Sequence, residues 1–165
     1  MKPKLYLEST VPSYYTARPN RSVVIAAQQQ QTRDWWEQRR MHFDIHVSQM
    51  VLDEIGMGDP AMAKLRLQLV QLFRMLSINA DVLRLTKALI DGGPLPAKAS
   101  RDATHIALAA VHQMHFLLTW NCRHIANPIM LRRSGEICAA HAMEAPVICT
   151  PNELLTNLIY EDEGI

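Results

Sequence analysis

Three acids and one amide stand at positions where a metal-dependent enzyme would need them. Glu8 follows a short apolar segment, Glu54 lies on a short amphipathic segment, and Asp102 lies near the start of an alanine-rich segment. Asn121 directly follows a second apolar segment. Two carboxylates about 4 Å apart repel by ~4 kcal/mol at an effective dielectric constant of roughly 20. If the fold gathers all three, it needs a proton or a cation there, and hard oxygen ligands suit Mg²⁺ or Mn²⁺.

Each acid also has a plainer interpretation when it is taken alone. Asp102 borders an apolar stripe with helical spacing, so it could simply satisfy a helix dipole in the first turns. Glu54 could be a solvated acid on an amphipathic helix, and Glu8 could cap a loop through Ser9 or Thr10. The stripe beside Asp102 consists of Ala103, Ile106, Ala107, Ala110, Val111 and Met114. The metal hypothesis therefore depends on convergence of the acids in the fold.

Predicted strands and helices alternate along the chain. Strands are expected at residues 4–7, 42–47, 75–78, 115–120 and 147–149. Helices are expected at 22–40, after the caps Ser48 and Asp59, and at 81–92, 97–114 and 128–142, with a last one opening at Thr150–Pro151. The segment after Glu8 is expected to be broken by Pro12. This pattern is typical of a three-layer α/β/α sandwich with a mainly parallel central sheet, which binds ligands beyond the carboxyl ends of its strands.

Size and composition favour one globular domain. The chain has 165 residues, of which 48% are hydrophobic and 20% charged. We expect a single domain over residues 1–158 and a frayed acidic tail over 159–165. The chain shows no apolar run of bilayer length and no signal-peptide pattern, so a cytoplasmic location is expected. The three cysteines are widely spaced and predict reduced thiols. A net charge of +1 leaves nucleic-acid binding undecided.

Other catalytic patterns are weak in this sequence. GxSxG, GxxxxGK[ST] and GxGxxG are all absent. A zinc enzyme using His105 or His112 remains an alternative, although no HExxH accompanies them, and His105 is more readily a hydrogen-bonding residue than a ligand. Trp35, Trp36 and Trp120 are expected in the core.

The order of the motifs resembles the PIN-domain family, in particular VapC-type toxins of bacterial toxin–antitoxin pairs. Four segments carry the resemblance: LYLEST at 5–10, SQMVLDEI at 48–55, SRDATHIALA at 100–109 and LLTWNC at 117–122. The third is the most specific. The family's acids correspond here to Glu8, Glu54, Asp102 and Asn121. Glu8 is one methylene longer than the family's usual aspartate, and Asn121 replaces an aspartate and so lacks its charge.

This resemblance implies a PIN-like fold and an endoribonuclease that hydrolyses RNA phosphodiester bonds with Mg²⁺ or Mn²⁺. Glu8 and Asp102 would bind the metal, with Glu54 binding it or positioning water and Asn121 contributing its side-chain oxygen. Thr119 or Ser9 would orient a ligand. The resemblance also implies an antitoxin partner and a homodimer, to which Met62, Leu65 and Leu69 could contribute. A PIN-like domain that binds RNA or protein without cutting is the alternative, because Asn121 lacks a charge.

Overall fold

A five-stranded, all-parallel sheet forms the centre of the molecule, in the order β3-β2-β1-β4-β5. The computed structural model describes residues 1–93 and 95–155. The strands are β1 (Lys4–Leu7), β2 (Asp44–Ser48), β3 (Arg74–Leu76), β4 (Phe116–Leu118) and β5 (Val147–Cys149). The α-helices are α1 (Thr10–Thr16), α2 (Val23–Gln38), α3 (Gln49–Ile55), α4 (Pro60–Val70), α5 (Ala80–Gly92), α6 (Ser100–Val111) and α7 (Pro128–Ala140). The predicted three-layer α/β/α class is confirmed.

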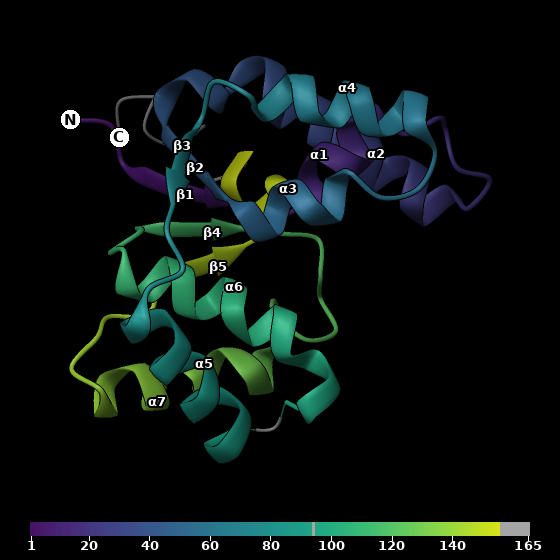
Figure 1. Ribbon diagram of the computed structural model, residues 1–165. Coiled ribbons are helices and arrows are strands. Elements are labelled where there is room, and N and C mark those ends of the chain that lie inside the picture. The colour runs from purple at the N-terminus through teal and green to yellow at the C-terminus, as the bar shows by residue number, and fades with distance from the viewer. Residues whose placement is uncertain (94, 156–165) are drawn as a thin grey trace, which may run out of the picture.

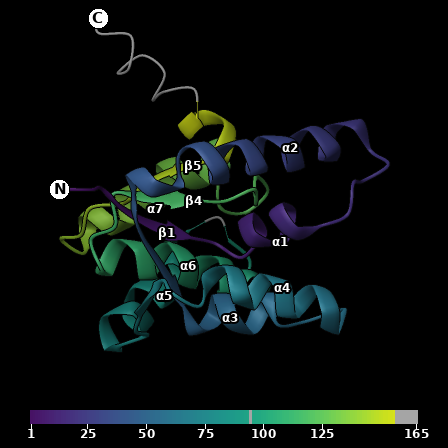
Figure 2. The same ribbon diagram turned by 90° about the horizontal axis from the view of Figure 1, so that it is seen from above.

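Helices cover both faces of this sheet. Tyr6 in the middle of β1 contacts His105 of α6, so α6 lies on the face to which Tyr6 points. Its neighbour Leu5 is in register with Phe116 of β4. Phe116 packs against Phe43, which packs against Trp35 of α2, so α2 covers the opposite face. Figure 2 shows this arrangement, with β1 and β4 between α2 on one side and α6 with α5 on the other. In Figure 1, α1–α4 fill the upper half and α5–α7 the lower half.

Side-chain caps fix where several helices begin. Ser48 accepts a hydrogen bond from the Val51 amide at the start of α3, and Asp59 accepts one from Met62 before Pro60 opens α4. Both predicted caps are confirmed. α5 begins one residue earlier than expected because Asn79 caps it, which leaves Asp81 in its first turn.

The prediction that Pro12 breaks the chain is wrong. Pro12 lies in the first turn of α1, where its missing amide hydrogen would have no partner within the helix in any case. The chain therefore passes from β1 into a helix within two residues, Glu8 and Ser9. This tight connection places three polar residues in succession at the carboxyl end of the central strand.

The helix expected over 97–114 is also shorter than predicted. A 3-10 turn at Ala97–Ala99 precedes α6, which ends at Val111. Gln113 then adopts a left-handed conformation with φ of 55°, which ends the helix and turns the chain toward β4. Likewise, Arg40–His42 forms a 3-10 turn, so β2 begins at Asp44 and not at residue 42 as expected. Both differences lie at element ends, where the periodicity of apolar residues is least informative.

The buried core agrees with the sequence pattern. Trp35, Trp36 and most of the predicted stripe on α6 are buried, because β1 and β4 are covered on both faces. Cys138 and Cys149 are buried free thiols, and Cys122 is exposed. Among the described residues, no helix is both long and apolar enough to cross a membrane. The predicted frayed tail at 159–165 lies outside the described residues.

Candidate metal centre

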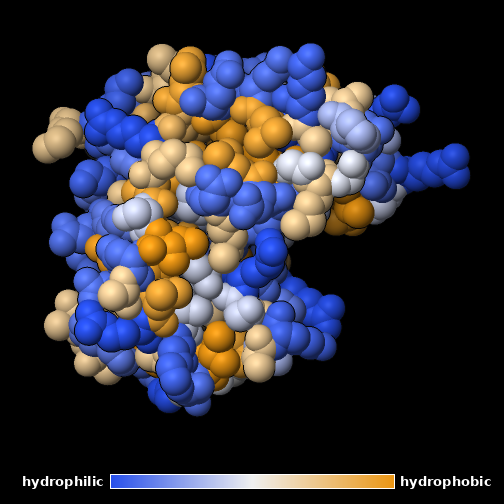
Figure 3. Space-filling view, viewed as in Figure 1, coloured by the Kyte–Doolittle hydropathy of each residue, from blue (hydrophilic) through white to orange (hydrophobic). Residues whose placement is uncertain are grey.

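The candidate residues gather where β1 and β4 end. Glu8 follows β1, Thr119 and Asn121 follow β4, Glu54 lies on α3, and Asp102 lies in the first turn of α6. This is the edge of the sheet at which a parallel α/β fold binds its ligands. Figure 3 shows the molecule hollowed on the side to which β1 and β4 point, with hydrophilic residues along the inner wall of the hollow.

Glu8 is almost completely buried, with a relative exposure of 3%. Its Oε2 accepts hydrogen bonds from the Thr10 amide at 3.1 Å, from the Thr10 hydroxyl and from Thr119 Oγ1 at 2.8 Å. Its Oε1 accepts one from Ser9 Oγ at 2.7 Å. Four donors that are themselves uncharged stabilise this buried carboxylate. Three of the four bond to Oε2, so Oε1 is the atom with acceptor capacity left.

Glu54 is held by a buried histidine. His105 Nε2 lies 2.6 Å from Glu54 Oε1, and the two side chains are 1% and 24% exposed, respectively. Burial by itself would raise the pKa of the Glu54 carboxyl. The hydrogen bond and electrostatic attraction of His105, with smaller effects of Ser9 and Arg101, outweigh burial and hold that pKa below its ordinary value. Glu54 is therefore a carboxylate at neutral pH.

Behind His105, two hydroxyls continue the network into the core. Tyr6 Oη lies 2.7 Å from His105 Nδ1 and 2.8 Å from Ser48 Oγ. Burial raises the pKa of the Tyr6 phenol far above its ordinary value, so the hydroxyl keeps its hydrogen. The network thus joins β1, the cap of α3 and α6 to the carboxylate of Glu54.

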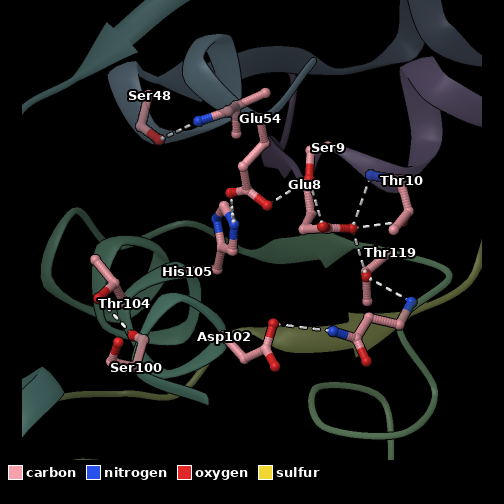
Figure 4. A network of polar contacts seen from close by, with 12 residues as sticks. Glu8, Ser9, Thr10, Ser48, Glu54, Ser100, Asp102, Thr104, His105 and Thr119 are labelled. Carbon is pink, nitrogen blue, oxygen red and sulfur yellow. Dashed lines mark hydrogen bonds and ion pairs between the residues drawn. The ribbon is translucent and has the colours of Figure 1, made fainter. Parts of the chain in front are cut away.

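The two carboxylates of Glu8 and Glu54 face each other across the hydroxyl of Ser9 (Figure 4). Glu8, Glu54 and His105 each offer one ligand atom, and the three atoms lie within 4.8 Å of one another. At that separation two unit charges repel by roughly 3.5 kcal/mol at an effective dielectric constant of about 20. Ser9 Oγ contacts both carboxylates, at 2.7 Å and 3.1 Å, but it carries a single hydrogen. The donor chemistry therefore fits a hard divalent cation between Glu8 and Glu54.

Asp102 belongs to a second, adjacent cluster. Its Oδ1 accepts from Asn121 Nδ2 at 3.0 Å, and its Oδ2 lies 2.8 Å from His124 Nδ1. Asn121 Oδ1 in turn accepts from the His124 amide at 3.0 Å. Both polar atoms of the Asn121 amide are thus engaged in orienting Asp102 and the loop. In the described part of the chain, the only basic groups within ion-pair distance of Glu8, Glu54 or Asp102 are the imidazoles of His105 and His124.

The structure brings together two of the predicted acids and places the third beside them. Glu8 and Glu54 share one site, whereas Asp102 pairs with Asn121 and is not within the 4.8 Å group. The predicted orienting roles of Ser9 and Thr119 agree with their hydrogen bonds to Glu8. His112 lies apart, with its Nε2 2.8 Å from the Ser77 carbonyl.

Tyr6 and His124 were not identified as site residues from the sequence, and Thr10 was identified only as a residue through which Glu8 could cap a loop. The spacing of His124, three residues after Asn121, was the available signal for one of them. Tyr6 sits inside an apolar strand and gave no signal.

Trp120 ties the end of β4 to its surroundings. Its backbone amide donates to Thr10 Oγ1 at 2.8 Å, and its indole Nε1 donates to Thr32 Oγ1 of α2 at 2.7 Å. The indole also stacks on Tyr14 of α1, with ring centroids 6.0 Å apart. Thr10, which also binds Glu8, is thereby fixed from the β4 side. Trp120 is half-buried, so the prediction that it lies in the core is only partly correct.

Comparisons with known proteins add no assignment. The chain matches no protein-family model, and no curated protein matches it significantly.

Proposed function

We propose that this protein is a ribonuclease that hydrolyses RNA phosphodiester bonds with Mg²⁺ or Mn²⁺. The observation that carries the proposal is the pair of facing carboxylates, Glu8 and Glu54, at the carboxyl end of a parallel sheet, with a single shared hydroxyl hydrogen between them. The PIN-like order of its motifs supports the same activity.

Each residue of the site would have a distinct role. Glu8 and Glu54 would hold the cation through Oε1 and Oε2 respectively, since their other oxygens are occupied by hydrogen bonds. Asp102, oriented by Asn121 and His124, would bind on the adjacent side or hold an attacking water. When bound, a divalent cation neutralises the facing carboxylates and stabilises charge on a phosphate. Arg101 is exposed, its charge acts on Glu54, and it is available to contact the RNA backbone.

The test is RNA cleavage by the purified chain with and without Mn²⁺, compared with Glu54→Gln and Asp102→Asn. Asp53→Asn is the matched control, because Asp53 is an exposed acid next to Glu54 whose side chain accepts a hydrogen bond from Gln49 and takes no part in the site. We expect cation-dependent cleavage that falls by roughly 100-fold or more in the two site variants and stays unchanged in the control. Equal cleavage by the wild type and Glu54→Gln would refute the proposal.

One observation favours a second candidate, a PIN-like domain that binds RNA or protein without cutting. The neutral Asn121 stands where a fourth acid would be expected, and its amide oxygen is engaged by the His124 amide. Retention of RNA on a filter, without cleavage at any Mn²⁺ or Mg²⁺ concentration, would support this candidate over the nuclease.

The same resemblance leads us to propose an antitoxin partner and a homodimer. Leu65 on α4 is 48% exposed and suits an interface, whereas Leu69 packs partly against the core. Sedimentation of the wild type and Leu65→Glu tests the dimer: a monomeric wild type would refute it.

A further inference from the structure

The two ring nitrogens of the buried His105 belong to one series of hydrogen bonds. Nε2 faces Glu54 Oε1 at 2.6 Å, and Nδ1 faces Tyr6 Oη at 2.7 Å. Tyr6 Oη also lies 2.8 Å from Ser48 Oγ, and Ser48 Oγ accepts from the Val51 amide at 3.3 Å. The series therefore begins at a backbone donor and ends at a carboxylate.

Counting hydrogens along this series fixes the tautomer. A carboxylate only accepts, so His105 Nε2 carries the hydrogen, and in a neutral ring Nδ1 then accepts from Tyr6. Ser48 in turn donates to Tyr6, and every hydrogen in the series has an acceptor. In the reverse direction, Nδ1 would donate to Tyr6 and Tyr6 to Ser48. The Ser48 hydrogen would then have no acceptor among the described contacts, and Ser48 is fully buried.

We propose that Ser48 and Tyr6 are positioning residues that hold His105 as an Nε2–H donor to Glu54, so that the imidazole is excluded from the metal ligands. This inference rests on the proposed function, which it deepens by limiting the protein ligands of the cation to oxygen atoms. A zinc site using His105 would need a bare Nε2.

Ser48 and His105 each help to fix the position of the Glu54 side chain. Ser48 caps α3, the helix that carries Glu54, while its hydroxyl bonds Tyr6 in β1. His105 meanwhile occupies Glu54 Oε1, which leaves Oε2 on the side of Ser9 and Glu8. Partners of metal-binding residues typically change metal affinity by roughly 10–100-fold when they are removed.

Nitrogen NMR of the full chain labelled with ¹⁵N-histidine tests the tautomer directly. Loss of one signal set in His105→Gln assigns His105. We expect the couplings of an Nε2–H, Nδ1-acceptor ring in the metal-free protein, unchanged when Mg²⁺ is added. A hydrogen on Nδ1, or loss of the Nε2 hydrogen when Mg²⁺ binds, would overturn the inference.

Calorimetric titration with Mn²⁺ tests the positioning role. Tyr6→Phe and His105→Leu should bind Mn²⁺ about 10–100-fold more weakly than the wild type. His105→Gln, which keeps an amide donor near the position of Nε2, should recover most of the affinity. Tyr15→Phe is the matched control, because the Tyr15 ring packs on Trp36 away from this network. Unchanged affinity in folded Tyr6→Phe would overturn the inference.

The two proposals fail in different ways. A wild type that binds no Mn²⁺ and cuts no RNA would overturn the proposed function, whatever the tautomer of His105. A wild type that binds Mn²⁺ through a deprotonated Nε2 would overturn this inference and leave a metal-dependent nuclease standing.

Discussion

Thr119→Val should destabilise the protein through its effect on the buried carboxylate of Glu8. Thr119 is fully buried, and its hydroxyl donates to Glu8 Oε2 at 2.8 Å while accepting from the Asn121 amide at 2.9 Å. Valine has the same shape but can make neither bond. A hydrogen bond to a charged acceptor contributes about 1.5–3 kcal/mol, and the part-buried bond from the Asn121 backbone to a neutral hydroxyl contributes less. We therefore expect a loss of about 2–3 kcal/mol.

Urea unfolding in EDTA measures this loss without any contribution from a bound cation. For a chain of 165 residues, it corresponds to a fall of about 4–12 °C in Tm, at an unchanged denaturant slope. Thr119→Ser keeps the hydroxyl and should lose only about 1 kcal/mol, for one buried methyl group.

Thr104→Val is the matched control, and a double-mutant cycle isolates the pair. The buried hydroxyl of Thr104 donates to a neutral acceptor, the Ser100 carbonyl, at 2.8 Å, so its loss should cost about 1 kcal/mol. In a cycle with Glu8→Gln, Thr119→Val should show a coupling above about 1 kcal/mol. If Thr119→Val costs no more than Thr104→Val, or the cycle shows no coupling, the hydroxyls do not stabilise a charged Glu8.

Three further predictions concern other parts of the fold. A Cβ on Gly93 would clash with the Leu89 carbonyl, whereas a Cβ on Gly135 in α7 would meet nothing within 4 Å. In urea unfolding, Gly93→Ala should therefore destabilise the protein by about 1–3 kcal/mol, and Gly135→Ala should stabilise it by about 0.5–1 kcal/mol. Equal effects of the two substitutions would contradict this packing. Burial raises the pKa of Cys149 from 9.0 to about 12, so the contribution of this thiol to stability is complete below pH 9 and is lost as the pH rises toward 12. Between pH 9 and pH 12, the free energy of unfolding of the wild type should fall by about 1.4 kcal/mol per pH unit relative to that of Cys149→Ala. Parallel pH profiles of the two proteins would refute the raised pKa of Cys149. A thiol-reactive disulfide reagent should label one thiol rapidly in the folded protein, that of Cys122, and all three in urea, with Cys122→Ser abolishing the rapid phase.

Much of the fold could be predicted because its elements are encoded locally. β1 and β5 have the predicted bounds, and Ser48 and Asp59 cap helices as their positions indicate. The errors lie where the local signal is ambiguous. Pro12 is as acceptable in the first turn of a helix as in a loop, so sequence alone did not reveal α1.

The acids of the site could be found from the sequence, but the partners of Glu54 and the His124 partner of Asp102 could not. Glu8, Glu54 and Asp102 follow from their places at strand ends and helix starts. Of the three hydroxyls that bond Glu8, that of Thr119 lies 111 residues away in the chain, and no periodicity specifies such a contact. Asp102 instead bonds Asn121 and His124, which lie 19 and 22 residues further along the chain, and a local pattern does not specify these contacts either.

The place of Trp120 gives the protein an optical probe of its own. Its amide donates to the same Thr10 hydroxyl that bonds Glu8, and its ring lies half-buried between Tyr14 and Thr32. Trp35 and Trp36 are buried in the core, so their emission should provide a constant background. A shift in Glu8 that disturbs Thr10 should change the intensity of Trp120 fluorescence. Cation titrations could therefore be followed in unlabelled protein, with Trp120→Phe as the blank.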